Sequence, residues 1–307
     1  MSELEEGIPL EGGVASDVRV IDTPDGPLVV KKALARLKVA ADWFSDPSRA
    51  MIEVAAIEAF GDLGGRETVP EIVWVYPDEN RFAMRLVDPR LRNWKTDLLE
   101  GRIDIVTAGG VGEILGRFHS RSSKRADLAQ QFSDLQFFRE LRVDPFFEYV
   151  ADKKPEYASR IRGVAQDMLG RRQALVHGDY SPKNILADGK DIVILDFEVA
   201  HWGDPRFDIG FCLAHLMLKS ALRGGYPAQM GDAIRSFLSG YQEHGLPVLD
   251  SGLANITGGL LLARLFGKSP ADYLSRLDPP LIEAKALQLL AVETSPLITD
   301  FLIFPEP

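Results

Sequence analysis

The sequence predicts an α+β protein of two lobes, a strand-rich N-terminal lobe and a mainly helical C-terminal lobe. Short β-branched runs separated by turn residues continue as far as residue 87, which indicates strands and hairpins. From Trp94 onward, apolar residues recur at helical spacing. The chain has 307 residues, more than a single hydrophobic core usually organises. We therefore expect a boundary between residues 1–87 and residues 88–307.

The composition indicates a globular protein that neither binds nucleic acid nor spans a membrane. Apolar residues make up 46% of the chain, which is enough to bury a substantial core. The formal net charge of −10 disfavours a nucleic-acid partner, because phosphate-binding surfaces need clustered Lys and Arg, although it permits a cationic substrate. The N-terminus is acidic, and no run of about 18 apolar residues is present, which argues against a signal peptide and a membrane span. We therefore expect a cytoplasmic protein.

Residues 9–32 have the pattern of a strand, a glycine pair and a hairpin. The turn of the hairpin is expected at residues 23–26, between two β-branched runs. The pair Gly12 and Gly13 lets backbone amides approach phosphate groups closely, and Ser16 offers a hydroxyl group. The same glycines fit an ordinary turn, and this stretch alone does not decide between a phosphate-binding loop and a turn.

A helix is expected next, with Asp46 as its N-cap, Pro47 in its first turn and Gly61 at its end. It carries two acidic residues, Glu53 near its centre and Glu58 nearer its end.

A second hairpin completes the expected sheet. Its strands are residues 70–76 and 81–87, joined by a turn at residues 77–80. Asp88-Pro89 ends the sheet, because proline bars continuation of a central strand. The N-terminal lobe is therefore predicted to be a five-stranded antiparallel sheet with one helix.

The rest of the chain is predicted to be mainly helical. Residues 104–120 carry apolar residues near the helical period of one buried face, and His119 near their end is interpreted as a structural or capping group. Further helices are expected at residues 228–243, 251–266 and 281–293. Four arginines in the helical stretches follow no decisive pattern: Arg139, Arg142, Arg160 and Arg162.

A third hairpin is predicted after a short apolar strand that ends at residue 176. Its turn is the Asp-Gly pair at residues 188–189, a strong hairpin signal. With this turn, residue 185 pairs with residue 194. Asn184 at the entrance of one strand then lies beside Asp196 at the exit of the other.

An amide oxygen beside a carboxylate is a set of hard ligands of the type that Mg²⁺ accepts. Asp179 lies five residues before Asn184, on the loop that enters the same hairpin. A carboxylate there is suited to take a proton from a hydroxyl group. Asp and Asn are also common turn residues, and Asp-Gly hairpins occur in many proteins that lack a catalytic site.

The motifs of this stretch resemble those of the aminoglycoside phosphotransferase and choline kinase family, which has a protein-kinase-like fold. The family pattern H-G-D-x-x-x-x-N is present at residues 177–184, and D-F-E is present at residues 196–198. The resemblance implies Asp179 as the catalytic base and Asn184 and Asp196 as ligands of Mg²⁺. It also implies ATP as the phosphoryl donor and a hydroxyl group of a small molecule as the acceptor.

The resemblance extends to the nucleotide-binding residues. The family places the lysine that contacts the α- and β-phosphates directly after a β-branched pair, which is the position of Lys31. The family also needs a glutamate to hold that lysine, and of the two candidates we prefer Glu53 to Glu58. The adenine ring is expected to bond to the backbone near Arg85, Leu86 and Val87.

Two further residues are expected to support the site. His177 is interpreted as orienting its loop, since kinase-type chemistry needs no imidazole proton carrier. Asp208 lies at a predicted helix start, where a carboxylate favours the positive end of the dipole. The resemblance implies that Asp208 accepts hydrogen bonds from the backbone of the catalytic loop.

Two other classes of function are considered. A nucleotide-binding module that has lost phosphoryl transfer is one, but a decayed site usually lacks at least one of the groups Lys31, Asp179, Asn184 and Asp196, and all are present. A protein kinase is the other, but no A-P-E segment follows, and the short distance from Asp196 to Asp208 leaves no room for a long activation loop. The acceptor stays open among methylthioribose, homoserine, choline, fructosamine and aminoglycosides.

Overall fold

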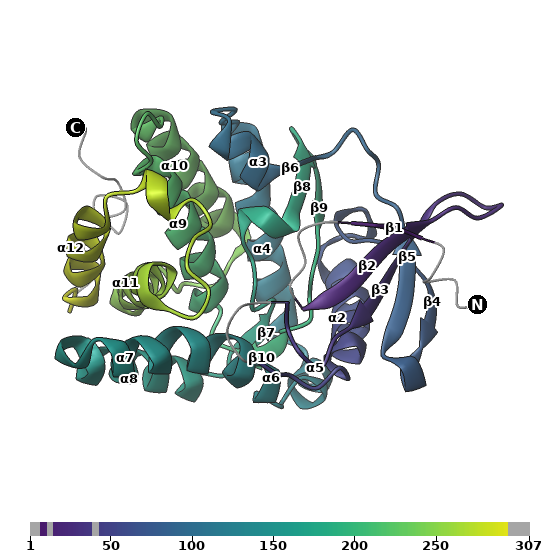
Figure 1. Ribbon diagram of the computed structural model, residues 1–307, viewed down its shortest axis with the longest axis horizontal. Coiled ribbons are helices and arrows are strands. Elements are labelled where there is room, and N and C mark those ends of the chain that lie inside the picture. The colour runs from purple at the N-terminus through teal and green to yellow at the C-terminus, as the bar shows by residue number, and fades with distance from the viewer. Residues whose placement is uncertain (1–6, 11–14, 39–42, 294–307) are drawn as a thin grey trace.

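The structure is a computed structural model that describes residues 7–10, 15–38 and 43–293. Its N-terminal part is built on an antiparallel sheet. Its strand order is β1-β2-β3-β5-β4, which confirms the expected five-stranded antiparallel sheet. The sheet lies at one end of the molecule and the helices make up the other (Figure 1). The strands are β1 (Ile8–Pro9), β2 (Ser16–Ile21), β3 (Leu28–Ala33), β4 (Ile72–Tyr76) and β5 (Arg81–Arg85).

The helix of the N-terminal part, α2 (Arg49–Gly64), differs from the prediction at both ends. Its N-cap is Ser48 instead of Asp46, and Asp46 lies in the turn before the helix, where its carboxylate accepts a hydrogen bond at 2.8 Å from the amide of Ser48. At the other end the helix continues through Gly61. A Cβ atom at Gly61 would lie 3.0 Å from the side chain of Val69, so this glycine permits close packing of the following segment instead of ending the helix.

The remainder is mainly helical, as predicted. The α4 helix begins after Asp104, whose carboxylate accepts hydrogen bonds from the amides of Val106 and Thr107, and ends at Ser122. The helices expected near residues 228, 251 and 281 are present, although the last of them ends at Leu290 instead of residue 293. The α-helices are α3 (Trp94–Leu99), α4 (Ile105–Ser122), α5 (Ala126–Gln131), α6 (Gln136–Phe138), α7 (Tyr149–Lys153), α8 (Ala158–Gly170), α9 (Arg206–Ser220), α10 (Pro227–His244), α11 (Ser251–Phe266) and α12 (Pro279–Leu290).

Short helical segments join these elements. One of them, η3 (Arg139–Glu148), is a π-helix that contains Pro145. The others are 3₁₀ turns: η1 (Arg66–Thr68), η2 (Pro77–Glu79), η4 (Pro155–Tyr157), η5 (Pro182–Asn184) and η6 (Leu274–Arg276). Among the described residues, no helix combines the length and the apolar character that crossing a bilayer requires.

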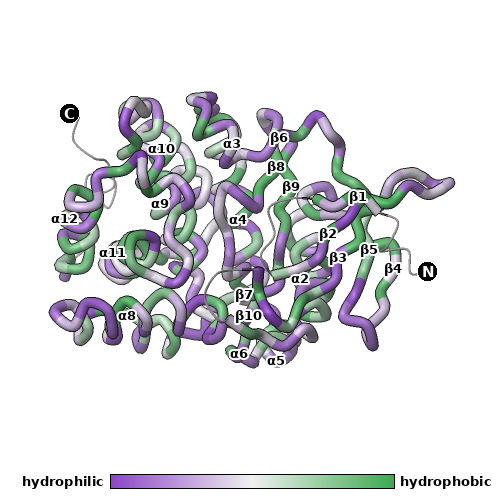
Figure 2. The backbone as a smooth tube through the Cα atoms, in the orientation of Figure 1, coloured by the Kyte–Doolittle hydropathy of each residue, from purple (hydrophilic) through white to green (hydrophobic). Residues whose placement is uncertain are grey.

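Two small sheets lie between the large sheet and the helices. One pairs β7 (Ala174–Val176) with β10 (His201–Gly203), and the other has the order β6-β8-β9, from β6 (Arg92–Asn93), β8 (Ile185–Asp188) and β9 (Asp191–Ile194). Ile185 pairs with Ile194, which confirms the register predicted for this hairpin. In Figure 2 the β8–β9 hairpin is largely hydrophobic, whereas the turn between β4 and β5 is hydrophilic.

The sheet and the helices share one hydrophobic core. Phe60 of α2 packs against Phe118 of α4, with ring centroids 3.8 Å apart, and against Phe197, with centroids 5.0 Å apart. Phe197 belongs to the D-F-E motif, so the motif is anchored where the two parts meet. Deeper in the helical part, every residue of α9 is buried.

Helices α4 and α10 approach closely through glycines. A Cβ atom at Gly112 would overlap the carbonyl group of Phe237, and one at Gly240 would overlap the carbonyl oxygen of Gly109. Replacing Gly112 with Ala is therefore expected to lower the free energy of unfolding by about 2–3 kcal/mol or more, because the two backbones must separate.

Thermal or urea unfolding checks this prediction, with Gly163→Ala in α8 as the matched control. No atom lies within 4 Å of a Cβ built at Gly163. Alanine there is expected to raise the free energy of unfolding by about 0.5–1 kcal/mol, since glycine is the poorer helix former. Equal stability of the two variants would show that the contact of α4 with α10 tolerates an added methyl group.

Candidate active site

A lysine and two carboxylates meet where the sheet faces the helices. Lys31 of β3 is buried, and its Nζ donates at 2.8 Å to Glu53 of α2 and at 2.5 Å to Oδ1 of Asp196. Lys32, the next residue of the strand, is exposed on the opposite face. Glu53 is 1% exposed, whereas Glu58 lies at the surface and pairs with Arg66. The structure therefore brings Lys31 together with Glu53 and not with Glu58.

The charges of this cluster depend on one another. Burial alone would lower the pKa of Lys31, but the carboxylates of Asp196 and Glu53 raise it above its ordinary value. Burial raises the pKa of Glu53 to about 7, although Lys31 acts in the opposite direction. Burial would also raise the pKa of Asp196, but Lys31 and Lys183 hold it below its usual range. The lysine is therefore cationic and Asp196 is anionic at neutral pH.

Asp208, in the first turn of α9, fixes the backbone of the loop that follows β7. The Asp208 carboxylate accepts hydrogen bonds from the amides of His177 at 2.7 Å and Gly178 at 2.9 Å. Nε2 of His119 lies 3.1 Å from the same carboxylate. Burial would raise the pKa of Asp208, but the hydrogen bond from His119 lowers it below its ordinary value. The buried carboxylate of Asp208 thus accepts hydrogen bonds from three donors.

His177 ties this loop to the strand that precedes Asp196. Its Nδ1 accepts from the amide of Asp179 at 3.1 Å, and its Nε2 donates at 3.1 Å to the carbonyl oxygen of Leu195. These partners assign the proton to Nε2, because a carbonyl oxygen only accepts. Burial lowers the pKa of His177, so the ring is neutral at pH 7. The neutral imidazole therefore links the backbone at Asp179 to the backbone at Leu195 through hydrogen bonds.

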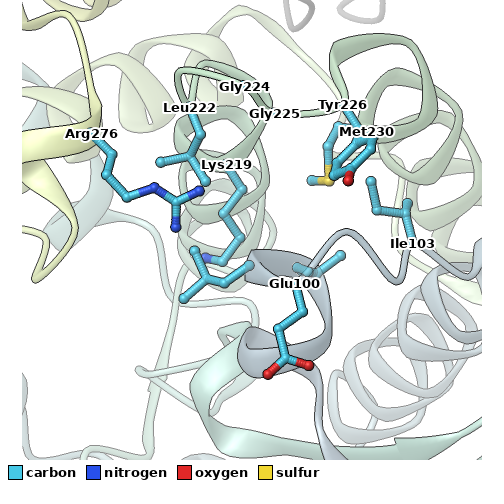
Figure 3. A pocket seen from close by; sticks show the side chains of 11 residues that line it. Glu100, Ile103, Lys219, Leu222, Gly224, Gly225, Tyr226, Met230 and Arg276 are labelled. Carbon is cyan, nitrogen blue, oxygen red and sulfur yellow. The ribbon is translucent and has the colours of Figure 1, made fainter.

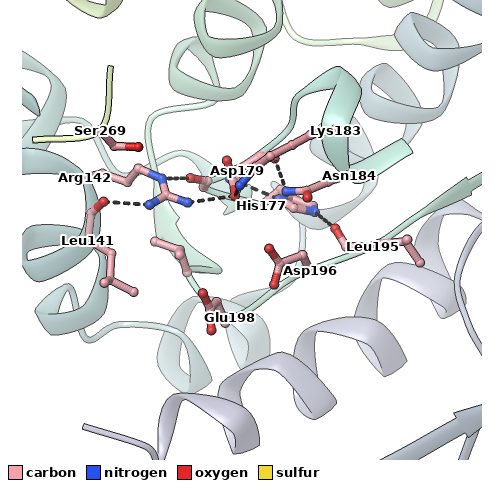
Figure 4. A network of polar contacts seen from close by, with 12 residues as sticks. Leu141, Arg142, His177, Asp179, Lys183, Asn184, Leu195, Asp196, Glu198 and Ser269 are labelled. Atoms are coloured by element: carbon pink, nitrogen blue, oxygen red, sulfur yellow. Dashed lines mark hydrogen bonds and ion pairs between the residues drawn. The ribbon is translucent and has the colours of Figure 1, made fainter. Parts of the chain in front are cut away.

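Asp179 is 2% exposed and lies between two cations. Its Oδ2 is 2.9 Å from a terminal nitrogen of Arg142 and 2.9 Å from Nζ of Lys183 (Figure 4). Arg142 also donates from Nε to the carbonyl oxygen of Gly178 at 2.8 Å. The π-helix η3 carries Arg142 to this position, and no sequence pattern had singled it out. Lys183, four residues along the chain, and Arg142, from a distant segment, therefore fix the orientation of Asp179.

Asn184 and Asp196 lie at the same end of the β8–β9 hairpin. The amide of Leu195 donates at 2.8 Å to the carbonyl oxygen of Asn184. The side-chain Nδ2 of Asn184 donates at 3.0 Å to the carbonyl oxygen of Asp179, which leaves its Oδ1 for another partner. Asp196 has a φ of 68°, a left-handed conformation that is uncommon outside glycine and concentrates at functional sites.

Glu198 is a site residue to which the sequence had assigned no role. One oxygen each from Glu53, Asp196 and Glu198 lie within 4.8 Å of one another, a grouping compatible with a metal ion. Glu198 also accepts at 3.0 Å from Nε of Arg49, a fully buried arginine at the start of α2. Oxygen atoms of this kind, with Oδ1 of Asn184, fit Mg²⁺ in their chemistry. The only signal in the sequence was the third letter of D-F-E.

Some expected residues are not joined to this cluster. Gly12 and Gly13 lie outside the described residues. Ser16 is buried in β2, and its hydroxyl has no hydrogen-bond partner among the residues that the structure describes.

The residues near which the adenine ring was expected lie at a separate cavity. Arg85, Leu86 and Val87 line a cavity of about 420 Å³ together with α4 and the turn before β9, and its lining includes neither Lys31 nor Asp196. The amides of Arg85 and Leu86 donate to the carbonyl oxygens of Glu71 and Pro27 at 2.8 and 3.2 Å, so they are already engaged within the sheet.

The chain resembles several curated proteins in sequence. It is 28% identical to a methylthioribose kinase from Bacillus velezensis, over 85% of this chain and 78% of that protein. It is 27% identical to a methylthioribose kinase from a Geobacillus species, over 71% of this chain and 62% of that protein. The chain thus spans less than two thirds of the length of the second relative.

The fold and the family match of the chain both lead to phosphotransferases. The solved structure of an amicoumacin kinase in complex with AMP-PNP and Ca²⁺ superposes with a TM-score of 0.56, at 13% identity, over 96% of this chain and 85% of that one. At this identity the likeness shows the fold alone. The model of the "phosphotransferase enzyme family" matches residues 6–243, most of the chain. The chain therefore belongs to the phosphotransferase enzyme family and is a small-molecule kinase of protein-kinase-like fold.

Proposed function

We propose that the protein transfers the γ-phosphoryl group of ATP to a hydroxyl group of a small molecule. The observation that carries the proposal is a series of contacts at one end of the β8–β9 hairpin: Lys31 pairs with Asp196, the amide of the adjacent Leu195 donates to the carbonyl oxygen of Asn184, and the side chain of Asn184 donates to the carbonyl oxygen of Asp179. Such a series joins a phosphate-binding cation, two candidate metal ligands and a candidate base. Because its donor is ATP, we expect the enzyme to act in the cytoplasm.

The nucleotide half of the site is assigned to Lys31 and its partners. Lys31 would contact the α- and β-phosphates, and the buried Glu53 would keep the amine in place. Asn184 through Oδ1 and Asp196 through its carboxylate would hold Mg²⁺, with Glu198 as a further oxygen nearby. A magnesium ion held by these residues would supply positive charge to offset the negative charge that develops during transfer.

The acceptor half is assigned to Asp179. The acceptor oxygen attacks the γ-phosphorus, its proton passes to the Asp179 carboxylate, and the bond from the γ-phosphorus to the bridging oxygen breaks to release ADP. Because phosphoryl transfer has a loose transition state, orientation of the acceptor matters more than the strength of the base. The ion pairs of Asp179 with Arg142 and Lys183 hold the carboxylate in a single orientation, which suits this role.

Magnesium-dependent ATP consumption against a panel of alcohols tests the proposal. The panel contains methylthioribose, homoserine, choline, a fructosamine and an aminoglycoside, and phosphorylation of an acceptor is followed directly. We expect at least one hydroxyl compound to be phosphorylated with a requirement for Mg²⁺. ATP binding without transfer to any alcohol would instead favour a nucleotide-binding module.

A further inference from the structure

A group of basic side chains extends from Asp179 into the helical part, in a chain whose net charge is −10. We call the group the basic wall and define it as Arg142 of η3, Lys183 of η5, Lys219 of α9 and Arg264 of α11. Arg142 and Lys183 share the single carboxylate of Asp179. The wall therefore carries more positive charge than Asp179 balances.

Lys219 and Arg264 have only uncharged polar partners in the described part of the chain. Nζ of Lys219 donates to the carbonyl oxygen of His215 at 3.2 Å and to the hydroxyl of Tyr273 at 3.3 Å. Arg264 makes two long hydrogen bonds of 3.4 Å, to Ser269 and Pro270, and its buried Nε has no partner among the described residues. No carboxylate of those residues forms an ion pair with either cation, although the more distant charge of Asp272 acts to raise the pKa of each.

The members of the wall are close to one another. The guanidinium groups of Arg142 and Arg264 lie over the same ring, that of Phe146, at 5.6 and 6.0 Å from its centroid. His215 lies one turn before Lys219 in α9 and is buried. Its pKa is well below the ordinary value, because of burial and because of the charges of Lys219, Arg264 and Lys183.

The anionic groups nearby are already paired. Asp272 forms an ion pair at 2.6 Å with Lys95 of α3, and this pair joins α3 to the segment after α11. Glu100 at the end of α3 pairs with Arg102 and Arg92. These acids therefore form no ion pair with Lys219, and the charge of Asp272 offsets that of Lys219 only in part.

A cavity adjoins Lys219. It has a volume of about 140 Å³ and lies between α3, α9 and α10. Figure 3 shows Lys219 and Arg276 on one side of this cavity and Glu100 on the other. A water molecule takes about 30 Å³ in the liquid, so the cavity has room for a few waters or for one small polar group.

The burial of Lys219 destabilises the folded state. Lys219 is 2% exposed, and burial lowers its pKa to about 7, with Lys95 and Arg264 acting in the same direction. The C-terminal dipole of α9 favours a cation in this last turn, but the effect is small beside the desolvation of an unpaired charge. A buried lysine whose pKa is lowered this far, beside a cavity, is a candidate binding-site residue.

We propose that the phosphoryl acceptor is an alcohol that also carries an anionic oxygen group, and that Lys219 and Arg264 bind this group while the hydroxyl faces Asp179. The inference rests on the proposed function and names the class of its acceptor. A carboxylate and a phosphate ester share the required chemistry. Cationic acceptors such as choline and aminoglycosides are disfavoured, because their ammonium groups would meet like charges.

Matched acceptor pairs test the proposal. The pairs are D-glycerate with glycerol, D-ribose 5-phosphate with D-ribose, and L-homoserine with its amide, and choline and kanamycin are the cationic compounds. We expect kcat/KM to favour anionic members about tenfold or more, since a buried charge pair contributes at least that factor. The first and second pairs separate carboxylate from phosphate. Equal or better turnover of a neutral or cationic compound would overturn the anionic acceptor and leave the proposed function standing.

Variants locate the effect. Lys219→Met and Arg264→Met are expected to raise the KM for the anionic acceptor about tenfold or more and to leave the KM for ATP unchanged. Lys219→Met should fold, because an apolar side chain of similar size replaces an unpaired buried cation. The control is Lys268→Met, whose Nζ lies over the ring of Tyr149 and which is not a member of the wall. An unchanged acceptor KM in both wall variants would contradict the proposal.

Sulfate binding tests the wall without catalysis. The protein is saturated with Mg²⁺ and AMP-PNP, and sulfate is compared with chloride at equal ionic strength. Sulfate is expected to raise the Tm of the wild type by about 2 °C or more and to have less effect on Lys219→Met. Equal effects on both proteins, or no effect, would overturn the anion site. If no compound is phosphorylated but sulfate binds as expected, the proposed function fails and the anion site stands.

Discussion

Replacing Asp179 with Asn is expected to lower kcat roughly 10²–10⁴-fold, the range that a positioned acid or base contributes. Asparagine has the same shape but cannot take the proton of the acceptor hydroxyl. It also leaves Arg142 and Lys183 without the carboxylate that they share at 2.9 Å. The loss should appear in kcat and in the single-turnover rate of transfer, while the affinity for ATP is unchanged.

The control for this variant is Asp188→Asn, in the exposed turn of the same hairpin. Asp188→Asn removes one negative charge nine residues after Asp179, and this variant should keep wild-type turnover. Unfolding curves of both variants should overlay the wild-type curve closely enough to exclude misfolding. If Asp179→Asn turns over its acceptor at the wild-type rate in a folded protein, Asp179 is not the base, and the carboxylate only anchors Arg142.

The features of the site that were predicted correctly depend on short separations in the chain. Asn184 and Asp196 were expected side by side because an Asp-Gly turn fixes the register of a hairpin, and the observed pairing of Ile185 with Ile194 follows that rule. Lys31 was chosen because the family places its lysine directly after a β-branched pair, and the alternation of the strand sends Lys32 to the other face. Turn type and strand period are local properties, so one sequence is enough to read them.

The features that the sequence left open depend on tertiary packing. Arg49 and Glu198 are separated by 149 positions, and Arg142 reaches Gly178 across 36. An isolated arginine on a helix has no periodic signature, and η3 is a π-helix whose spacing differs from the usual 3.6-residue period. Lys219 was hidden for a similar reason, because α9 is buried on all sides and has no polar face.

The boundaries of α2 show the same limit on a smaller scale. Asp46-Pro47 is a standard sign of a helix start, yet here Asp46 makes a turn that delays the helix to Arg49. The guanidinium of Arg49 makes tertiary contacts at this boundary. It donates to the carbonyl oxygens of Ser45 and Asp46 at 3.1 Å and also contacts those of Ala15 and Leu34. The contacts with Ala15 and Leu34 join residues 34 and 15 positions apart and tie the start of α2 to the segments next to β2 and β3.

Replacing Asp208 with Asn is expected to lower the free energy of unfolding by roughly 3 kcal/mol or more, because hydrogen bonds to a buried charge are strong and their donors would lose their acceptor. The amides of His177 and Gly178 both donate to the carboxylate, one to each oxygen. In asparagine one of these oxygens becomes an NH₂ group, which cannot accept. Chemical denaturation at pH 7 measures the loss, with Asp232→Asn on the exposed face of α10 as a control that should unfold like the wild type.

The pH dependence of Asp208→Asn separates a charge effect from a packing effect. The folded-state pKa of Asp208 lies below its ordinary value, so its stabilisation is complete above about pH 4 and is lost as the pH falls through the folded-state pKa. The variant has no such group, so the difference in stability between wild type and variant should be constant from pH 5 to pH 8 and should shrink in acid. A difference that persists unchanged in acid would mean that shape, not charge, is what the loop needs from this residue. In either case activity should fall with stability, because the amides that Asp208 holds belong to the two residues directly before Asp179.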